Sequence, residues 1–156
     1  MKNTIESIRR NHPDCLTRSC RENQCRLRLD GVKPASLAII HGTKYQKNHH
    51  FTKKLCDRIV FCGEHDFVLA AVELKGGRTI RRMSAAISQI QNGLRVAGDI
   101  LGTRPVAQWF PLLLYSGSMK PEEIRLLRTE SVVFRGEPKI VEKRGCDTRF
   151  SEILSN

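Results

Sequence analysis

The chain of 156 residues is 40% hydrophobic, and 27 Lys and Arg residues against 16 Asp and Glu residues give it a formal net charge of +11. This size and apolar content fit a single folded domain over residues 1–156 rather than a disordered chain. The sequence has no apolar run near the roughly 18–20 residues of a membrane span and no apolar signal-peptide core. We therefore expect a soluble cytoplasmic protein without a membrane partner, whose positive charge favours nucleic acid as its partner.

The N-terminal region combines a short helix with a basic segment rich in cysteine. Residues 3–11 are predicted to be helical and residues 14–26 to be turn-rich or helical, because Pro13 interrupts the pattern. Three cysteines recur every five residues, and the last two just meet zinc-ligand spacing, so one interpretation is a zinc site at Cys15, Cys20 and Cys25. The alternative is small buried thiols, and without a signal sequence all cysteines are expected to be reduced.

A strand and a basic segment come next. Residues 35–42 are predicted to form a strand, which places His41 at its end. Residues 43–54 are predicted to form a polar loop in which basic and aromatic residues alternate, a composition that can bind a nucleic-acid backbone and stack bases. Lys53 and Lys54 are therefore candidate nucleic-acid-binding residues, and the alternative is an ordinary exposed loop.

The next segment carries the candidate chemistry. Residues 59–62 and 67–72 are apolar runs that flank the polar turn G-E-H-D, which predicts a β-hairpin. Asp57 precedes the first strand, and Glu73 and Lys75 end the second. Antiparallel neighbours place the start of one strand beside the end of the other, and side chains two residues apart share a face. Two carboxylates and an ammonium group should therefore converge.

This cluster predicts a divalent-metal site. Carboxylate oxygens are the ligands that Mg²⁺ and Mn²⁺ prefer, and such an ion polarises a phosphoryl oxygen and activates a bound water. A lysine beside the ion can orient that water or offset the developing charge. The alternative is a surface hairpin on which the glutamate and lysine form a solvated ion pair.

The clearest predicted helix spans residues 79–101, because large apolar residues recur there at steps of three and four. Arginines 78, 81 and 82 surround its start and are candidate phosphate-binding residues; an exposed basic turn is the alternative. At 100° per residue, Gln91 lies at the edge of the apolar stripe and Gln89 on the far side. Of the two glutamines, Gln91 is therefore the one that helix geometry places closer to the buried face.

The C-terminal part is predicted to hold four further features. Residues 109–115 form a buried strand, and residues 121–128 form a short helix that begins with proline and two acids. Residues 131–135 and 138–143 form a final hairpin. Residues 146–156 form a tail with one helical turn.

The residues Asp57, Glu73 and Lys75 resemble the D…(D/E)-x-K signature of the PD-(D/E)XK nuclease superfamily, although Cys56 stands where that family often has proline. The element order also resembles its αβββαβ, restriction-endonuclease-like core. The resemblance implies an α/β (α+β) fold with its core at residues 3–115 and a C-terminal helix and β-hairpin elaboration at 120–156. It further implies a metal ligand from the backbone carbonyl of Leu74, a catalytic glutamine at Gln91, and an additional acid from the first helix, for which Glu22 is the candidate. The segment C-R-E-N-Q-C-R is similar to one in short bacterial proteins.

Together, these features predict a nuclease that depends on Mg²⁺ or Mn²⁺ and hydrolyses DNA in preference to RNA. The alternative is a non-catalytic nucleic-acid-binding or regulatory module on the same fold, possibly stabilised by zinc. A chain this short has little room for a separate sequence-reading domain, so targeting would come from a homodimer or from a partner protein.

Overall fold

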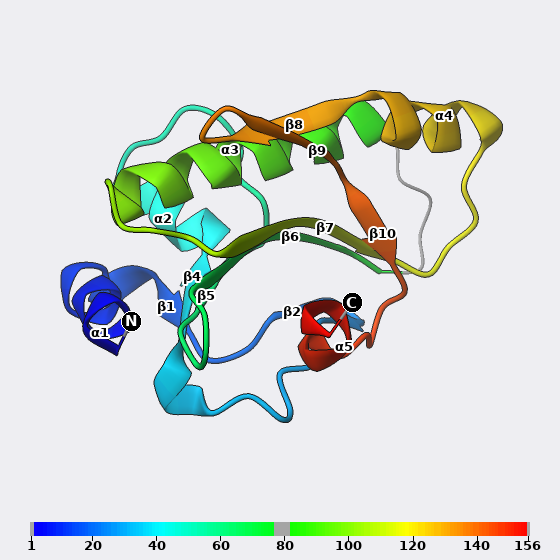
Figure 1. Ribbon diagram of the computed structural model, residues 1–156. Coiled ribbons are helices and arrows are strands. Elements are labelled where there is room, and N and C mark those ends of the chain that lie inside the picture. Colours follow the sequence, from blue (N-terminus) through cyan, green and yellow to red (C-terminus); the bar gives the residue numbers. More distant parts are fainter. Residues whose placement is uncertain (1, 77–81, 156) are drawn as a thin grey trace.

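The computed structural model describes residues 2–76 and 82–155, which form an α+β fold built on one mixed six-stranded sheet (Figure 1). In sheet order, the strands are β1 (Leu16–Thr17), β4 (Leu37–His41), β5 (Arg58–Cys62), β6 (Val68–Lys75), β7 (Gln108–Tyr115) and β10 (Glu142–Arg144). The α-helices are α1 (Lys2–Asn11), α2 (Gly42–Asn48), α3 (Met83–Leu101), α4 (Pro121–Thr129) and α5 (Phe150–Leu154). Two small hairpins complete the fold: β2 (Arg21–Glu22) with β3 (Cys25–Arg26), and β8 (Ser131–Phe134) with β9 (Glu137–Ile140).

The centre of the sheet is a meander followed by a crossover. β4, β5 and β6 are antiparallel neighbours, whereas β6 and β7 are parallel and are joined through α3. Parallel strands require such a crossover, usually a helix. β10 then pairs parallel to β7. As a result, the start of β5 and the ends of β6 and β7 lie at the same end of the sheet.

Apolar side chains alternate along the central strands and fill one cluster on each face of the sheet. Ile59 and Leu69 point to the face that packs against α1 and α3, and Val60 and Val72 point to the opposite face. The opposite face is covered by the β2–β3 hairpin and α5, which lie below the sheet in Figure 1. The period of two along each strand therefore decides which layer every side chain joins.

The α+β class and most predicted elements are confirmed. The order from α1 to β7 follows the expected helix, three strands, helix and strand, with short elements inserted; its identity as a restriction-endonuclease-like core stays a prediction. Residues 42–48 are helical, although residues 43–54 were predicted to be a loop. Residues 14–26 are turn-rich, one of the two predicted alternatives, and contain the short strands β1, β2 and β3. The C-terminal elaboration is more than peripheral, because β10 extends the central sheet and α5 buries Phe150 and Ile153.

The expectation that all cysteines are reduced was wrong for two of them. Cys25 and Cys146 form a disulfide that joins β3 to the segment after β10, across 121 residues of sequence. The other four cysteines are free and buried, as expected for small apolar side chains. Within residues 2–76 and 82–155, no helix combines the length and apolarity needed to cross a membrane.

Candidate active site

The candidate site lies at the end of the sheet where β5 begins and β6 ends. Arg58 pairs with Val72 in the antiparallel register, so Asp57 and Glu73 lie beside each other. Glu73 Oε1 accepts a hydrogen bond of 3.1 Å from the backbone N–H of Asp57. Asp57 Oδ2 accepts one of 2.7 Å from the backbone N–H of Leu74. Each carboxyl group is therefore held by the backbone of the other strand, and the two acids meet as the sequence predicts.

Glu73 is fully buried, with an exposed fraction of 0%. Burial, the charge of Asp57 and a hydrogen bond between the two carboxyl groups raise the pKa of Glu73 to about 9, and Lys75 opposes this rise only in part. Glu73 is therefore protonated at neutral pH. Groups whose pKa is displaced this far by burial and a like charge are concentrated at functional sites.

Lys75 and Gln89 both contact the Oε2 atom of Glu73. Lys75 Nζ lies 3.3 Å from Glu73 Oε2, and the lysine side chain is 32% exposed, so it links the buried acid to solvent. Gln89 Nε2 also donates to Glu73 Oε2, and it lies 3.4 Å from the backbone carbonyl oxygen of Leu55. Gln89 is itself buried. The structure thus brings together Asp57, Glu73 and Lys75, and it adds a glutamine that the sequence analysis placed elsewhere.

The prediction that Gln91 faces the site was wrong. The carboxamide of Gln91 binds the backbone of Val133 in β8, accepting from its N–H at 2.7 Å and donating to its carbonyl at 2.9 Å. The stripe argument failed because it counted large apolar residues only. The face of α3 that lies on the sheet carries small residues beside Gln89, and a Cβ on Gly93 would come within 2.3 Å of Cys56 Sγ. Small residues at that spacing were the signal that could have identified Gln89.

The turn before α2 positions Asp57 from the other side. The backbone N–H of Gly42 donates to the Asp57 carbonyl at 2.9 Å. A Cβ at Gly42 would lie 1.9 Å from the carbonyl oxygen of Cys56, so only glycine permits this close approach. His41 accepts a long hydrogen bond of 3.4 Å from the backbone N–H of Lys44 and so helps to begin α2. His41 therefore serves the turn that holds Asp57.

Arg58 occupies the opposite face of the sheet at the same end. Its guanidinium group donates to the backbone carbonyls of Ser19, Arg21 and Asp57. Its Nη1 lies 3.3 Å from Glu22 Oε2, and the side chain of Glu22 is 40% exposed. Glu22 is thus bound to an arginine across the sheet from Glu73, which contradicts the idea that it completes the metal site. No sequence pattern indicated Arg58, because its partners are backbone groups far away in the chain.

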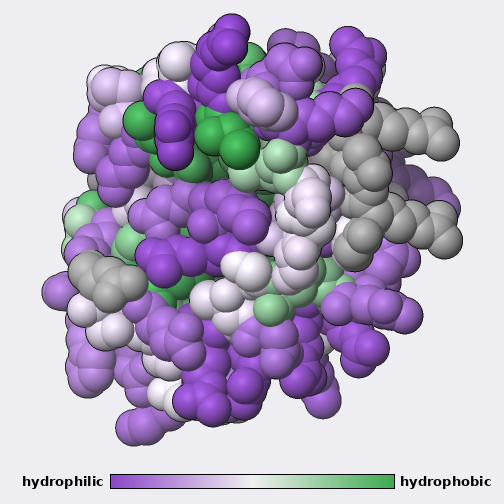
Figure 2. Space-filling model, turned by 90° about the vertical axis from the view of Figure 1, so that its right-hand side faces the viewer, coloured by the Kyte–Doolittle hydropathy of each residue, from purple (hydrophilic) through white to green (hydrophobic). Residues whose placement is uncertain are grey.

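Exposed cations flank the candidate site. Lys53 and Lys54 are exposed just before Asp57, and Arg82 is exposed where α3 begins. Arg78 and Arg81 lie outside the described residues. Figure 2 shows that hydrophilic side chains cover most of the face at which β6 ends. The role of these cations in nucleic-acid binding stays a prediction.

The zinc interpretation of the N-terminal cysteines was wrong. Cys25 is consumed by the disulfide, and Cys15 and Cys20 belong to the apolar clusters on opposite faces of the sheet. In the part of the chain that the structure describes, no group of three or more His, Cys, Asp or Glu side chains is arranged to hold a metal ion. The Cys20 thiol is buried, and burial raises its pKa to about 12, so it is not a ready thiolate ligand.

A pronounced pocket of the described residues lies away from the acids. It has a volume of about 730 Å³, is mainly apolar, and lies along β1 and β4, where Leu16, Leu37 and Ile39 line it. A phosphodiester backbone is charged and extended, so a mainly apolar pocket at the far edge of the sheet offers it few favourable contacts. We therefore place the candidate site at the paired carboxyl groups, where the polar chemistry is.

The donor set of these acids fits a single Mg²⁺ or Mn²⁺ ion. Both ions prefer hard oxygen ligands and retain several waters, so one or two carboxylates suffice. A buried carboxyl group that holds a proton beside another acid can instead bind a cation, because the cation supplies the positive charge that the proton supplies in its absence. The backbone carbonyl of Leu74 as a third ligand stays a prediction.

The fold and site together define an α+β protein in which a buried glutamate meets an aspartate beside a lysine. No protein-family model matches the chain, and neither a curated protein nor a solved structure shows significant similarity to it.

Proposed function

We propose that the protein is a divalent-metal-dependent nuclease that hydrolyses phosphodiester bonds, in DNA in preference to RNA. The observation that carries this proposal is the meeting of the Asp57 and Glu73 carboxyl groups at a strand end, with Lys75 Nζ 3.3 Å from Glu73. Two adjacent acids, one of them fully buried, mark a place where a cation is electrostatically favoured. The net charge of +11 supports a polyanionic substrate.

Each residue of the candidate site has its own role in the proposed reaction. Asp57 and Glu73 would hold the metal ion, which when bound supplies Lewis-acid activation of water and phosphate. Gln89 and the Asp57 N–H keep the Glu73 carboxyl group in place. Lys75, partly exposed, is placed to orient an attacking water or to stabilise negative charge on the phosphate. The exposed Lys53, Lys54 and Arg82, with Arg78 and Arg81, would position the backbone.

The direct test is cleavage. The full-length protein is incubated with supercoiled plasmid and with labelled DNA and RNA oligonucleotides, with Mg²⁺ or Mn²⁺, beside Asp57→Asn, Lys75→Met and the matched control Lys33→Met. Lys33 is exposed near the opposite end of β4. We expect a loss of about 10³-fold or more for the two site variants, the scale on which loss of a central catalytic group acts. Equal residual cleavage by wild type and both site variants would reject the enzyme.

A second test does not depend on turnover. Because Glu73 is protonated at pH 7 and a metal ligand must be ionised, Mn²⁺ binding should release about one proton per ion. Titration calorimetry in two buffers of different ionisation enthalpy measures that number. Binding without proton release would show that the ion does not enter between the two acids. If nucleic acid binds but is not cut, the non-catalytic binding module becomes the better description.

A further inference from the structure

The β2–β3 hairpin lies directly beside the end of the candidate active site. A Cβ added to Gly76 would come within 3.8 Å of the Cβ of Asn23 at the hairpin tip. Cys146, which anchors the hairpin, has its sulfur 3.4 Å from the carbonyl oxygen of Lys75. The hairpin belongs to the face of the sheet opposite α3. The hairpin is therefore next to the end of β6, close to the paired acids.

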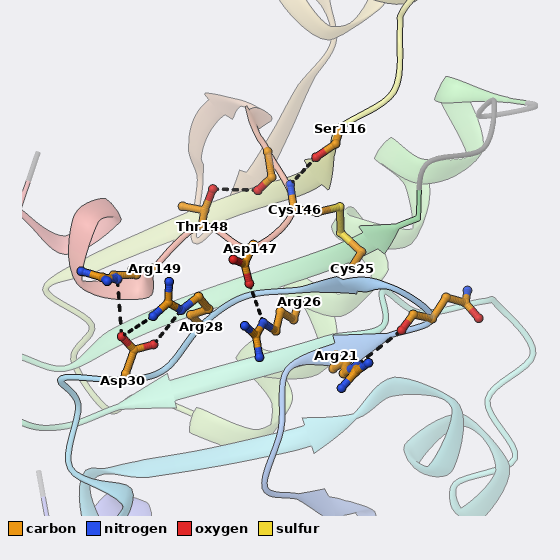
Figure 3. A network of polar contacts seen from close by, with 12 residues as sticks. Arg21, Cys25, Arg26, Arg28, Asp30, Ser116, Cys146, Asp147, Thr148 and Arg149 are labelled. Atoms are coloured by element: carbon orange, nitrogen blue, oxygen red, sulfur yellow. Dashed lines mark hydrogen bonds and ion pairs between the residues drawn. A yellow bond between two sulfur atoms is a disulfide. The ribbon is translucent and has the colours of Figure 1, made fainter.

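Several bonds hold the hairpin rigidly (Figure 3). The Cys25–Cys146 disulfide ties it to the segment after β10, and the backbone N–H of Asp147 donates to the Arg26 carbonyl at 2.8 Å. Arg26 also forms an ion pair with Asp147. On the other strand, Arg58 donates to the Arg21 carbonyl. A recognition element needs such a rigid support, because ordering a flexible side chain on binding costs free energy and reduces selectivity.

The tip of this hairpin carries side chains suited to nucleic acid. Arg21, Asn23 and Gln24 are all exposed. Among the described residues, no side chain or backbone group forms a hydrogen bond with the amide of Asn23 or Gln24, and Arg21 donates only a long bond of 3.4 Å to the Asn23 carbonyl. Asn23 has φ 54°, a left-handed conformation that asparagine tolerates, so the turn itself explains this residue. The turn makes no such demand of Gln24.

We propose that the β2–β3 hairpin is a nucleic-acid-binding element that contacts DNA beside the cleaved bond, an inference that rests on the proposed nuclease function. Arg21 holds a backbone phosphate, since its guanidinium group offers forked donors. The amides of Asn23 and Gln24 contact base edges, which asparagine and glutamine can bind with paired hydrogen bonds. The hairpin thereby gives a small domain a preference for the nucleotides at the cut.

Binding is measured without cleavage, so that the two proposals can fail separately. Full-length Asp57→Asn protein is titrated into a fluorescein-labelled 20-base-pair DNA and its single strand, and anisotropy is followed between 50 and 200 mM salt. Arg21→Gln is compared with Arg10→Gln, an identical change at an exposed position on α1. Arg21→Gln should weaken binding about 3- to 10-fold and lower the slope of log affinity against log salt by about one. Arg10→Gln should change both quantities less.

A second variant addresses the bases. Asn23→Gly with Gln24→Ala removes both amides and keeps a residue that adopts positive φ, so the turn is preserved. Cleavage of a randomised DNA library by otherwise wild-type protein is sequenced. The preference at nucleotides flanking the cut should fall by about 5- to 10-fold in the variant, the range of a lost base contact.

The outcomes are separable. Equal weakening by Arg21→Gln and Arg10→Gln, or absence of measurable binding by Asp57→Asn protein, overturns the hairpin's role. If the amide variant cleaves DNA as fast as the wild type and with an unchanged sequence preference, the proposed base contacts are rejected and the proposed nuclease function stands. Hairpin-dependent binding without any cleavage leaves the binding role standing and rejects the nuclease.

Discussion

Two ionisable residues are buried at the same end of the sheet, on opposite faces, and they are stabilised in opposite ways. Glu73 faces α3 with 0% of its surface exposed, and Arg58 faces the β2–β3 hairpin with 4% exposed. Glu73 meets another acid and keeps a proton, so its pKa rises to about 9. Arg58 meets three carbonyl groups and a glutamate and is satisfied as a cation.

The difference follows from what each side chain can do with a proton. An arginine cannot lose its charge under ordinary conditions, so the protein must supply acceptors that replace water. A glutamate can be neutralised, so burial and a neighbouring acid are tolerated at the expense of its charge. Arg58 is therefore a fixed part of the frame. Glu73 is a group whose charge returns when a cation arrives, which is the property expected of a metal ligand.

The largest effect should come from breaking the Arg58 network. Arg58→Met leaves the carbonyls of Ser19, Arg21 and Asp57 without this donor and Glu22 without its partner. We expect a loss of about 4 kcal/mol in the free energy of unfolding, since each buried unsatisfied group costs about 1–3 kcal/mol. Urea unfolding measures it. The loss should be nearly the same at pH 5 and pH 8, because the arginine stays charged throughout.

Glu73→Gln should raise the free energy of unfolding instead of lowering it, and the size of this gain should depend strongly on pH. The pKa of Glu73 has its ordinary value of 4.5 in the unfolded chain and rises to about 9 in the folded protein, so folding takes up a proton at pH values between the two. The stability of the wild type is therefore lost progressively as pH rises from about 4.5 to about 9. The neutral amide lacks this loss, so the variant should gain stability on the order of 3 kcal/mol at pH 7 and almost none at pH 4.5.

Urea unfolding at several pH values tests the Glu73 prediction beside Glu6→Gln, an exposed glutamate on α1. The difference between Glu73→Gln and wild type should widen as pH rises, while Glu6→Gln follows the wild type. A constant difference between pH 5 and pH 8 would mean that the pKa of Glu73 is not raised in the folded protein. The proposed metal site would then lose one of its supports.

The two faces also differ in how far the sequence predicts them. Asp57, Glu73 and Lys75 were identified because an antiparallel hairpin has only one register that buries its apolar runs, and that register fixes the three groups at one end. Arg58 was not identified, since its carbonyl partners are 37 and 39 residues away or on its own neighbour. Every residue has a backbone carbonyl group, so the sequence does not show which of them will accept a hydrogen bond from an arginine. The face built from periodic patterns was predictable, and the face built from long-range bonds was not.

The elements show the same division. α3 and the central strands have long apolar patterns, and the sequence predicts them. α3 begins at Met83 and ends, as predicted, at Leu101, and residues 79–81 of its predicted range lie outside the described residues. β10 has the polar sequence E-K-R and is recognised only by its pairing with residues 112–114 of β7. α2 is a short helix of seven residues without an apolar stripe. The Cys25–Cys146 disulfide joins two residues that are 121 positions apart in the sequence, and no local spacing of cysteines predicts such a pair.

The smallest and most specific prediction separates the two glutamines of α3. Gln89 binds Glu73 and Gln91 binds the backbone of β8, so the two residues have different tasks although they are two positions apart. Gln91→Ala should lower the free energy of unfolding by about 1–2 kcal/mol through two lost hydrogen bonds and leave metal affinity unchanged. Gln89→Ala should weaken Mn²⁺ binding and cleavage about 10-fold, as loss of a group that orients a ligand does.

Titration calorimetry with Mn²⁺ and urea unfolding of both variants complete this test. Gln89 acts through Glu73, so its loss should also shift the pH dependence of Mn²⁺ binding, an effect that a purely structural glutamine would not produce. Gln89→Glu provides a sharper contrast, because a second carboxyl group beside Glu73 should resist ionisation of the cluster still further. If Gln89→Ala and Gln91→Ala lower stability equally and neither alters Mn²⁺ binding, then Gln89 only fills space beneath α3, and the site reduces to the three residues at the strand ends.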